Sequence, residues 1–288
     1  MMKIGVSSYS FSKYMKATGA DYFAVAEIAK QQGFDGIEFL QLTKREQDET
    51  LLDTAKALRE HCEKLGIEIC AYTIGADLLN GLDGGSAEDE PARLKACVDV
   101  CHALGAKVMR HDVVWSLKPG MKSWLDALDL IVPAIREVTE YAEKLGVRTC
   151  TENHGYIFQD SSRMETLIRK VNHPNYGWLV DMGNFSCADE SNSYAVGVAA
   201  PYAFHVHAKD FLMKPGSTTD LGAGWFRTRG GNYLRGTIVG HGVVPVRQCV
   251  NILKKAGYDG WLSLEFEGLE DNLTATELGL AYLRKITG

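Results

Sequence analysis

The sequence has no hydrophobic run long enough to cross a membrane, which takes about 20 consecutive apolar residues. Residues 1–8 turn polar after too few apolar residues to form the core of a signal peptide. We therefore expect a cytoplasmic protein that has no membrane partner.

Paired cysteine motifs are also missing. The chain has seven cysteines, and no two of them form a Cys-x-x-Cys pair. Cys97 and Cys101 stand four apart on one face of a predicted helix, a spacing that excludes a zinc knuckle. Reduced, buried thiols are the expected state. A catalytic cysteine is left open, although no partner residue recommends one.

A basic excess is absent as well, because 31 lysine and arginine residues stand against 37 acidic residues, for a formal net charge of −6. This balance argues against a nucleic-acid partner but permits a small anionic substrate. No glycine-rich dinucleotide fingerprint follows the first predicted strand, where the sequence reads Ser7-Ser-Tyr-Ser10. No proline- or serine-rich linker divides the chain, so we expect one domain over residues 1–288.

The chain does contain a repeated unit, in which a helix end, a glycine and a β-rich run follow one another. A glycine suits the left-handed residue that closes a helix, and cationic side chains near it favour the negative end of the helix dipole. The five junction glycines are Gly33, Gly66, Gly105, Gly146 and Gly257. Repetition on this scale indicates a closed array or a solenoid.

Eight strands are predicted, at residues 3–7, 35–39, 67–73, 106–110, 147–152, 177–181, 203–208 and 260–265. Helical periodicity occupies residues 22–32, 49–65, 91–104, 124–145, 162–171, 193–199, 244–256 and 272–286. Eight strands that each precede a helix, in 288 residues, are typical of the α/β class known as the (β/α)8 TIM barrel, which usually takes about 250 residues. An open doubly wound sheet is the alternative.

The ends of the last four predicted strands carry acidic and imidazole side chains. His205 and His207 stand two apart, so a strand points both rings to one side. The carboxyl ends of barrel strands converge on one face. There, three carboxylates and one imidazole form a divalent-metal site, because without a cation the carboxylates would repel one another. The expected ligands are Glu152, Asp181, His207 and Glu265. Each acid taken alone is equally well explained as a solvated strand end.

Four motifs carry a resemblance to a known family. They are Glu152-Asn-His-Gly155, Asp181-Met-Gly-Asn184, His205-x-His-x-Lys-Asp210 and Leu264-Glu265. In this order, the chain resembles the xylose-isomerase-like barrel superfamily of sugar-phosphate isomerases and epimerases over nearly its whole length. The resemblance places the metal ligands on the same four residues and prefers the second histidine of the pair. Glu267 shares the strand phase of Glu265 and is the alternative to it.

The resemblance implies an isomerase or epimerase that acts on a keto- or hydroxy-sugar, or on a sugar phosphate. A divalent cation would act as a Lewis acid and stabilise the enediolate left when a carbon-bound proton departs. Glu152 and Glu265 would be the catalytic pair, one taking the proton and the other returning it. If a β-hydroxyl leaves instead, the outcome is dehydration. One nitrogen among oxygen ligands suits Mn²⁺ first, with Mg²⁺, Co²⁺ or Zn²⁺ as alternatives.

Polar residues at or just beyond strand ends are expected to bind the substrate, namely Glu38, His111, Asn153, His154, Asn184 and Lys209. Tyr9 and Phe11 are candidates for the pocket wall. Residues 211–243 form a long glycine-rich segment, which we expect to be a loop that acts as a lid or as a contact in a homo-oligomer. Its candidate substrate contacts are Arg227, Arg229 and His241, and its Gly230-Gly231 pair permits hinging.

Two departures from the family pattern leave the reaction open. Free-ketose 3-epimerases usually carry a histidine where this chain has Asn184, and the position six residues beyond Glu152 is Phe158 here. A dehydratase or lyase that acts on a keto-sugar or cyclic polyol is therefore the first alternative. A nuclease like the DNA-repair members of the superfamily and a non-catalytic sugar-binding barrel are less favoured.

Overall fold

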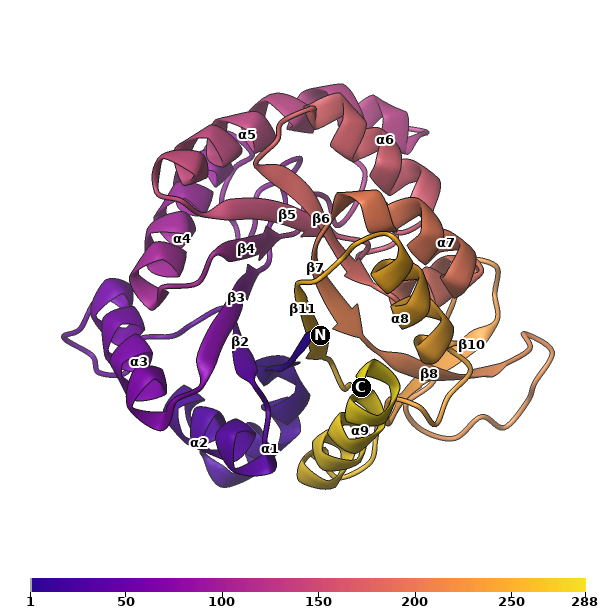
Figure 1. The fold of residues 1–288 in the computed structure, drawn as a ribbon. Helices are drawn as coiled ribbons and strands as arrows, with labels where there is room; N and C mark the ends of the chain where they lie inside the picture. The colour runs from indigo at the N-terminus through magenta and orange to yellow at the C-terminus, as the bar shows by residue number, and fades with distance from the viewer. Residues whose placement is uncertain (1) are drawn as a thin grey trace.

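A closed barrel of eight parallel strands forms the centre of the molecule, as seen in a computed structural model that describes residues 2–288. Round the barrel the strand order is β1-β11-β7-β6-β5-β4-β3-β2. Figure 1 looks into the barrel, with the helices forming a ring outside the strands. The predicted (β/α)8 barrel is confirmed.

The barrel strands agree with the predicted ranges to within two residues at each end. Their bounds are β1 Lys3–Ser7, β2 Gly36–Leu40, β3 Glu68–Ile74, β4 Val108–His111, β5 Arg148–Glu152, β6 Tyr176–Asp181, β7 Ala203–Ala208 and β11 Trp261–Leu264. All pairings between them are parallel, so their carboxyl ends meet at one mouth of the barrel.

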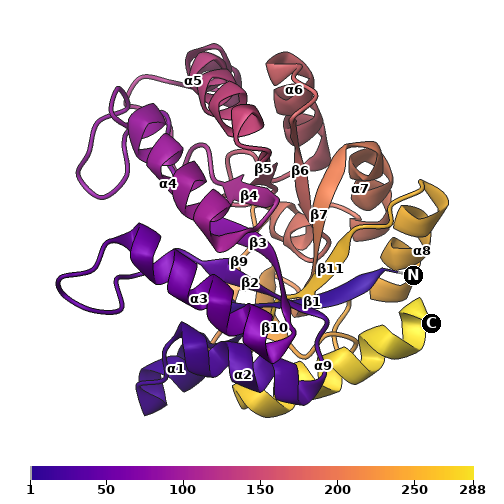
Figure 2. The same ribbon diagram turned by 60° about the vertical axis from the view of Figure 1, so that its left-hand side comes forward.

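The helices lie along the outside of the strands (Figure 2), and the predicted ones also agree to within two residues. They are α2 Tyr22–Gln32, α3 Leu51–Leu65, α4 Glu90–Leu104, α5 Trp124–Lys144, α6 Ser161–Val171, α7 Asn192–Ala199, α8 Val246–Lys255 and α9 Asn272–Thr287. Helix α1, Ser12–Thr18, was not predicted. All five junction glycines have a positive φ, between 68° and 93°, which explains why glycine stands where these helices end.

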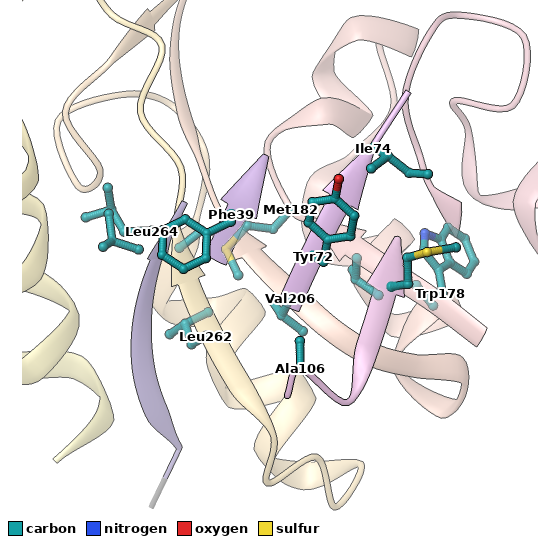
Figure 3. Close-up of a cluster of buried hydrophobic side chains, with 14 of the residues drawn as sticks. Phe39, Tyr72, Ile74, Ala106, Trp178, Met182, Val206, Leu262 and Leu264 are labelled. Atoms are coloured by element: carbon teal, nitrogen blue, oxygen red, sulfur yellow. The ribbon is translucent and has the colours of Figure 1, made fainter. Parts of the chain in front are cut away.

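The two faces of the strands have different partners. Outward side chains, among them Phe39, Trp178 and Val206, belong to the large apolar cluster drawn in Figure 3. A much smaller inner cluster, made of Ala71, Val108, Cys150 and Leu179, fills the middle of the barrel. Because side chains alternate along a strand, the residues two positions after those of the inner cluster also point inward, and they lie closer to the mouth of the barrel. This phase brings Arg110, Glu152 and Asp181 together above the inner cluster.

Residues 211–243 are not the structureless loop that the sequence predicts. Strands β8 Asp210–Lys214, β9 Phe226–Arg227 and β10 Tyr233–Thr237 form a separate antiparallel sheet in the order β8-β10-β9. This small sheet extends from the outer ring on the right of Figure 1. Phe211 and Leu234 are fully buried beneath it. The segments were missed because one strand is only two residues long and the sequence around them is rich in glycine.

Asp210 joins the two ends of the small sheet. Its buried carboxylate accepts hydrogen bonds from the backbone N–H groups of Phe211 and Val244 on one oxygen, and of Gly240 and Gly242 on the other. A side chain at position 242 would collide with this carboxylate, since a Cβ there would lie 2.2 Å from its Oδ1 atom. The segment of residues 211–243, which carries the small sheet, is therefore fixed at its base by Asp210.

We expect Asp210→Asn to lower the free energy of unfolding by about 2–4 kcal/mol, because an amide N–H would face two buried backbone donors. Urea denaturation measures this change. Asp271→Asn is the matched control, since Asp271 caps α9 and asparagine caps a helix as well, so its cost is below about 0.5 kcal/mol. Equal effects of the two variants would contradict the account of Asp210.

Among the described residues, every helix is too short or too polar to span a bilayer. All seven cysteines are free thiols, and six of them are buried. Burial raises the pKa of the Cys62 and Cys150 thiols to about 12, which keeps them protonated and unreactive at neutral pH. This agrees with the expectation of reduced, buried thiols.

Candidate metal centre and pocket

The four predicted metal ligands meet at the mouth of the barrel. One donor atom from each of Glu152, Asp181, His207 and Glu265 lies within 4.8 Å of the others. The first three residues belong to β5, β6 and β7, and Glu265 directly follows β11. All four are buried or nearly so, with Glu265 the most exposed at 9%. The barrel closure thus gathers side chains that are more than 110 residues apart.

His207 turns its Nδ1 atom towards the carboxylates. This atom lies 3.5 Å from Glu265 Oε2 and 3.8 Å from both Asp181 Oδ2 and Glu152 Oε1. The Nε2 atom points the other way and contacts the carboxylate of Glu38 at 2.9 Å. Of the two ring nitrogens, Nδ1 is therefore the one placed to bind a cation.

Two atoms of this cluster are buried without a hydrogen-bond partner, Asp181 Oδ2 and His207 Nδ1. Asp181 Oδ1, in contrast, accepts the backbone N–H groups of Gly183 and Asn184. Buried polar atoms normally have a partner, but Asp181 Oδ2 has only the Lys209 ammonium at 3.1 Å, and the nearest carboxylate oxygen to His207 Nδ1 is at 3.5 Å. These two electron-pair donors face each other and are free to bind a further ligand. Carboxylate oxygens and an imidazole nitrogen suit a divalent cation, and the residues present therefore fit a metal ion.

Lys209 lies beside the cluster and offsets part of its negative charge. Its Nζ atom is 2.6 Å from Glu265 Oε2, 3.1 Å from Asp181 Oδ2 and 3.5 Å from Glu267 Oε2. Burial opposes the charge on Lys209, but Asp181 and Glu265 hold its pKa well above the ordinary value. Burial likewise opposes ionisation of Glu265, yet Lys209 and His207 hold the pKa of that carboxyl well below its usual range. Both groups are therefore charged at neutral pH.

Arg110 is a site residue that the sequence reasoning missed. Its Nη2 atom lies 2.5 Å from Glu152 Oε2 and 3.2 Å from Asp112 Oδ1, while Asn184 donates to Glu152 Oε1 at 2.8 Å. Burial raises the pKa of Glu152 although the Arg110 guanidinium opposes this shift. The sequence contained a hint of this role. Arg110 is the last residue of a predicted strand and stands two residues after Val108, so both side chains point to the inside of the barrel.

We expect Arg110→Met to destabilise the fold by about 3–5 kcal/mol, since it leaves the carboxylate of Glu152 buried without its cation and leaves Asp112 with His154 alone. Guanidinium denaturation measures the loss. Arg284→Met, which removes a half-exposed ion pair with Asp35, should cost no more than about 1 kcal/mol. Similar losses in both variants would mean that the buried ion pairs of Arg110 do not support the site.

A pocket of about 340 Å³ opens directly above the cluster. His154 and Lys209 line it, as the sequence predicts for substrate contacts, and so does Tyr9. Asp112 holds His154 in place, because its Oδ1 atom lies 3.1 Å from His154 Nδ1. The ring of Trp115 packs edge-on against the His154 ring, with 5.1 Å between the ring centroids. The remaining lining residues are Leu40, Gln41, Thr73, Gly75, Arg110, Glu152, His207, Glu265 and Glu267.

Several predicted substrate residues lie away from the pocket. Glu38 is fully buried below the cluster, bound by both histidines of the pair. His111 is fully buried on the opposite side of β4, because it follows the inward-pointing Arg110. Asn153 braces neighbouring strands, donating to Asp181 O and accepting from Trp178 Nε1.

Five more of the predicted residues are outside the pocket lining. They are Asn184, Phe11, and Arg227, Arg229 and His241 from the segment of residues 211–243. Asn184 supports Glu152, as described above, and Phe11 is fully buried in the apolar core. Arg229 is engaged by Asp160 at 2.7 Å and by the carbonyl of Tyr156. Arg227 donates to Tyr233, and His241 is exposed in the turn after β10. The two arginines of this segment thus bond to other residues of the protein and do not face the pocket.

Comparison with known families agrees with this geometry. Residues 26–286 match the family model described as the xylose isomerase-like TIM barrel. The chain belongs to this family. Its resemblance to that superfamily, first seen in the strand-end motifs, is confirmed over nearly the whole length.

Individual relatives are distant. The chain is 23% identical to an inosose dehydratase from Histophilus somni (strain 129Pt), over 80% of this chain and 81% of that protein. A solved structure of IOLI protein with a binding zinc atom has a TM-score of 0.76 at 19% identity, covering 99% of this chain and 98% of the other. D-psicose 3-epimerase with D-tagatose, from Clostridium cellulolyticum H10, gives 0.73 at 17% identity, with 99% of both chains covered. The structural likenesses show the shared fold.

Proposed function

We propose that this member of the family is a divalent-metal-dependent isomerase or epimerase that acts on a keto- or hydroxy-sugar, or on its phosphate, by moving a carbon-bound proton. The observation that carries the proposal is the group of four donor atoms from Glu152, Asp181, His207 and Glu265, which lie within 4.8 Å of one another beneath an open pocket. The fold is shared with an epimerase structure and with a structure described as having a binding zinc atom.

The metal ion, held by Glu152, Asp181, His207 and Glu265, would supply Lewis-acid polarisation of a substrate carbonyl and so acidify the neighbouring C–H bond. Mn²⁺ is the ion we propose first, because one nitrogen among three carboxylates suits it. Zn²⁺, Mg²⁺ and Co²⁺ are the alternatives. Chelation should therefore abolish activity, and added Mn²⁺ should restore it.

Glu265 and Glu152 are the proposed proton-transfer groups, and their surroundings differ. Glu265 reaches the pocket and is bound on Oε2 by Lys209, whereas both oxygens of Glu152 are engaged by Arg110 and Asn184. Glu265 is thus the freer of the two to accept a proton from the substrate. Lys209 and His154 line the pocket and are proposed to donate hydrogen bonds to substrate oxygens.

Dehydration is the second candidate reaction. The curated relative, an inosose dehydratase, covers 80% of this chain, and Asn184 stands where free-ketose epimerases usually carry histidine. Proton removal next to a carbonyl is common to both reactions. In isomerisation or epimerisation a proton returns to a carbon of the substrate. In dehydration a β-hydroxyl leaves instead.

The test is a screen of ketoses, ketose phosphates and inososes in heavy water with Mn²⁺, followed by NMR. Deuterium incorporation with a changed configuration or carbonyl position supports the isomerase or epimerase, and loss of water supports the dehydratase. The same incubations with chelator are expected to show no exchange. Absence of both exchange and water loss from every compound at saturating Mn²⁺ would count against the proposal.

A further inference from the structure

Beneath the proposed metal ligands lies a second cluster, made of Glu38, His205 and His207. All three side chains are almost completely buried in the barrel interior, and of the three only His207 reaches the pocket lining. Glu38 Oε2 contacts His205 Nε2 at 2.8 Å and His207 Nε2 at 2.9 Å, and Glu38 Oε1 contacts His207 Nε2 at 3.1 Å. Within residues 2–288, these two rings are the only side chains that hydrogen-bond this carboxylate.

A carboxylate can only accept hydrogen bonds, so each Nε2 atom that faces Glu38 must carry a proton. In the neutral ring, the form that can bind a metal, this leaves the lone pair of His207 Nδ1 directed at Glu152, Asp181 and Glu265. Outer carboxylates of this kind fix the tautomer and the ring orientation of a metal-binding histidine and make it a stronger ligand. The wrong tautomer would put a proton where the cation binds.

We infer that Glu38 is a positioning residue that sets the tautomer of His207 for metal binding, and that His205 holds Glu38 in place from the other side. This inference rests on the proposed metal site, which it extends to residues outside the pocket. It also explains why two histidines occur when only one reaches the donor cluster. His205 supplies the second N–H that a fully buried carboxylate needs.

Glu38→Gln tests the inference because the amide cannot avoid His207. If its NH₂ group takes the place of Oε1, it lies 3.1 Å from His207 Nε2, and if it takes the place of Oε2, it lies 2.9 Å away. In both orientations the NH₂ group crowds the Nε2 proton, and the one oxygen that remains is a weaker acceptor than a carboxylate, so the tautomer with the proton on Nδ1 gains population. That proton then faces the carboxylates and competes with the cation.

Two measurements test the role of Glu38 without using enzyme activity. One measures Mn²⁺ affinity, and the other measures which ring nitrogens carry protons. Calorimetric titration of the metal-stripped protein with Mn²⁺ is expected to show a dissociation constant about 10- to 100-fold higher in Glu38→Gln than in wild type. NMR of ¹⁵N-histidine-labelled, metal-free protein, at a pH high enough for His207 to be neutral, is expected to show protons on Nε2 of both His205 and His207 in wild type. In the variant, part of the His207 population should carry its proton on Nδ1 instead.

Glu90→Gln is the matched control, because Glu90 is another buried carboxylate, bonded to Asp77 N and Arg93 and outside both clusters. It should lower thermal stability but leave the Mn²⁺ affinity unchanged. An affinity of Glu38→Gln within threefold of wild type, or a wild-type His207 without a proton on Nε2, would overturn the inference. If wild type bound no divalent ion, the proposed function would fail, and the wild-type NMR spectrum would still decide the role of Glu38, even if the variant did not fold.

Discussion

Replacing Asp181 with asparagine is expected to weaken Mn²⁺ binding by at least about 100-fold, more than the loss of a supporting group outside the coordination sphere. Asp181 Oδ1 accepts the backbone N–H groups of Gly183 and Asn184, and Oδ2 faces the donor cluster. In the variant the amide oxygen keeps the two backbone bonds, which leaves the NH₂ group turned towards the cation. The fold is thus retained while one ligand becomes a donor. Calorimetric titration with Mn²⁺ measures the change.

Glu267→Gln is the control for this prediction. Glu267 lines the same pocket and lies 3.5 Å from Lys209, but it stands outside the group of four donors. It shares the inward strand phase of Glu265 and was the alternative ligand in the sequence. We expect its affinity for Mn²⁺ to stay within threefold of wild type. A larger loss in Glu267→Gln than in Asp181→Asn would show that the ligand set has been assigned to the wrong residues.

Glu265→Gln is expected to slow deuterium exchange at the reacting carbon by about 10²- to 10⁴-fold, the range for losing a proton-transfer group. The amide cannot accept the proton, and it also loses the charge that Lys209 neutralises at 2.6 Å. The rate should be compared with wild type at equal metal occupancy, measured by elemental analysis, so that weaker metal binding does not account for the loss. The substrate is the compound that exchanges with wild type.

The outcome that would contradict this role is exchange within tenfold of wild type at equal occupancy. In that case the carboxylate of Glu265 would serve only as a ligand. The same measurement on Glu267→Gln should show a change below tenfold, because Glu267 contacts Lys209 more loosely and does not reach the cluster. The pair thus separates a reacting carboxylate from a neighbouring one on the same strand end.

Much of the barrel was predictable because local signals mark its elements. Glycines with positive φ close or follow the helices, capping boxes at Thr50 and Ser123 open two of them, and short apolar runs mark the strands. The small sheet of β8, β9 and β10 has no such signal. Its stability depends on Asp210, which bonds residues up to 34 positions away, and contacts of this range leave no local pattern.

The donor cluster was predictable for a different reason, namely that parallel strands end at one mouth of a barrel. The strand positions alone bring Glu152, Asp181 and His207 within reach of one another, and the structure does so. What the sequence could not give is which neighbours face the pocket. His111 and Arg110 are adjacent in the chain, yet alternation sends the first into the packing layer and the second to Glu152.

The role of Glu38 could not be predicted because it depends on contacts across the barrel. Glu38 and His205 are 167 residues apart, on β2 and β7, which are separated in the barrel by β1 and β11. As a strand-end acid, Glu38 resembles the ligands themselves, which is why it was expected to bind substrate. Its complete burial and its two imidazole partners assign it to the support of the site instead.

The most direct test of the account is anomalous X-ray diffraction from crystals of this protein soaked with Mn²⁺. We predict one strong manganese peak among Glu152, Asp181, His207 Nδ1 and Glu265, with the ammonium group of Lys209 turned away from the ion. A crystal saturated with Mn²⁺ that shows no peak at this position, or a peak held by other side chains, would contradict it.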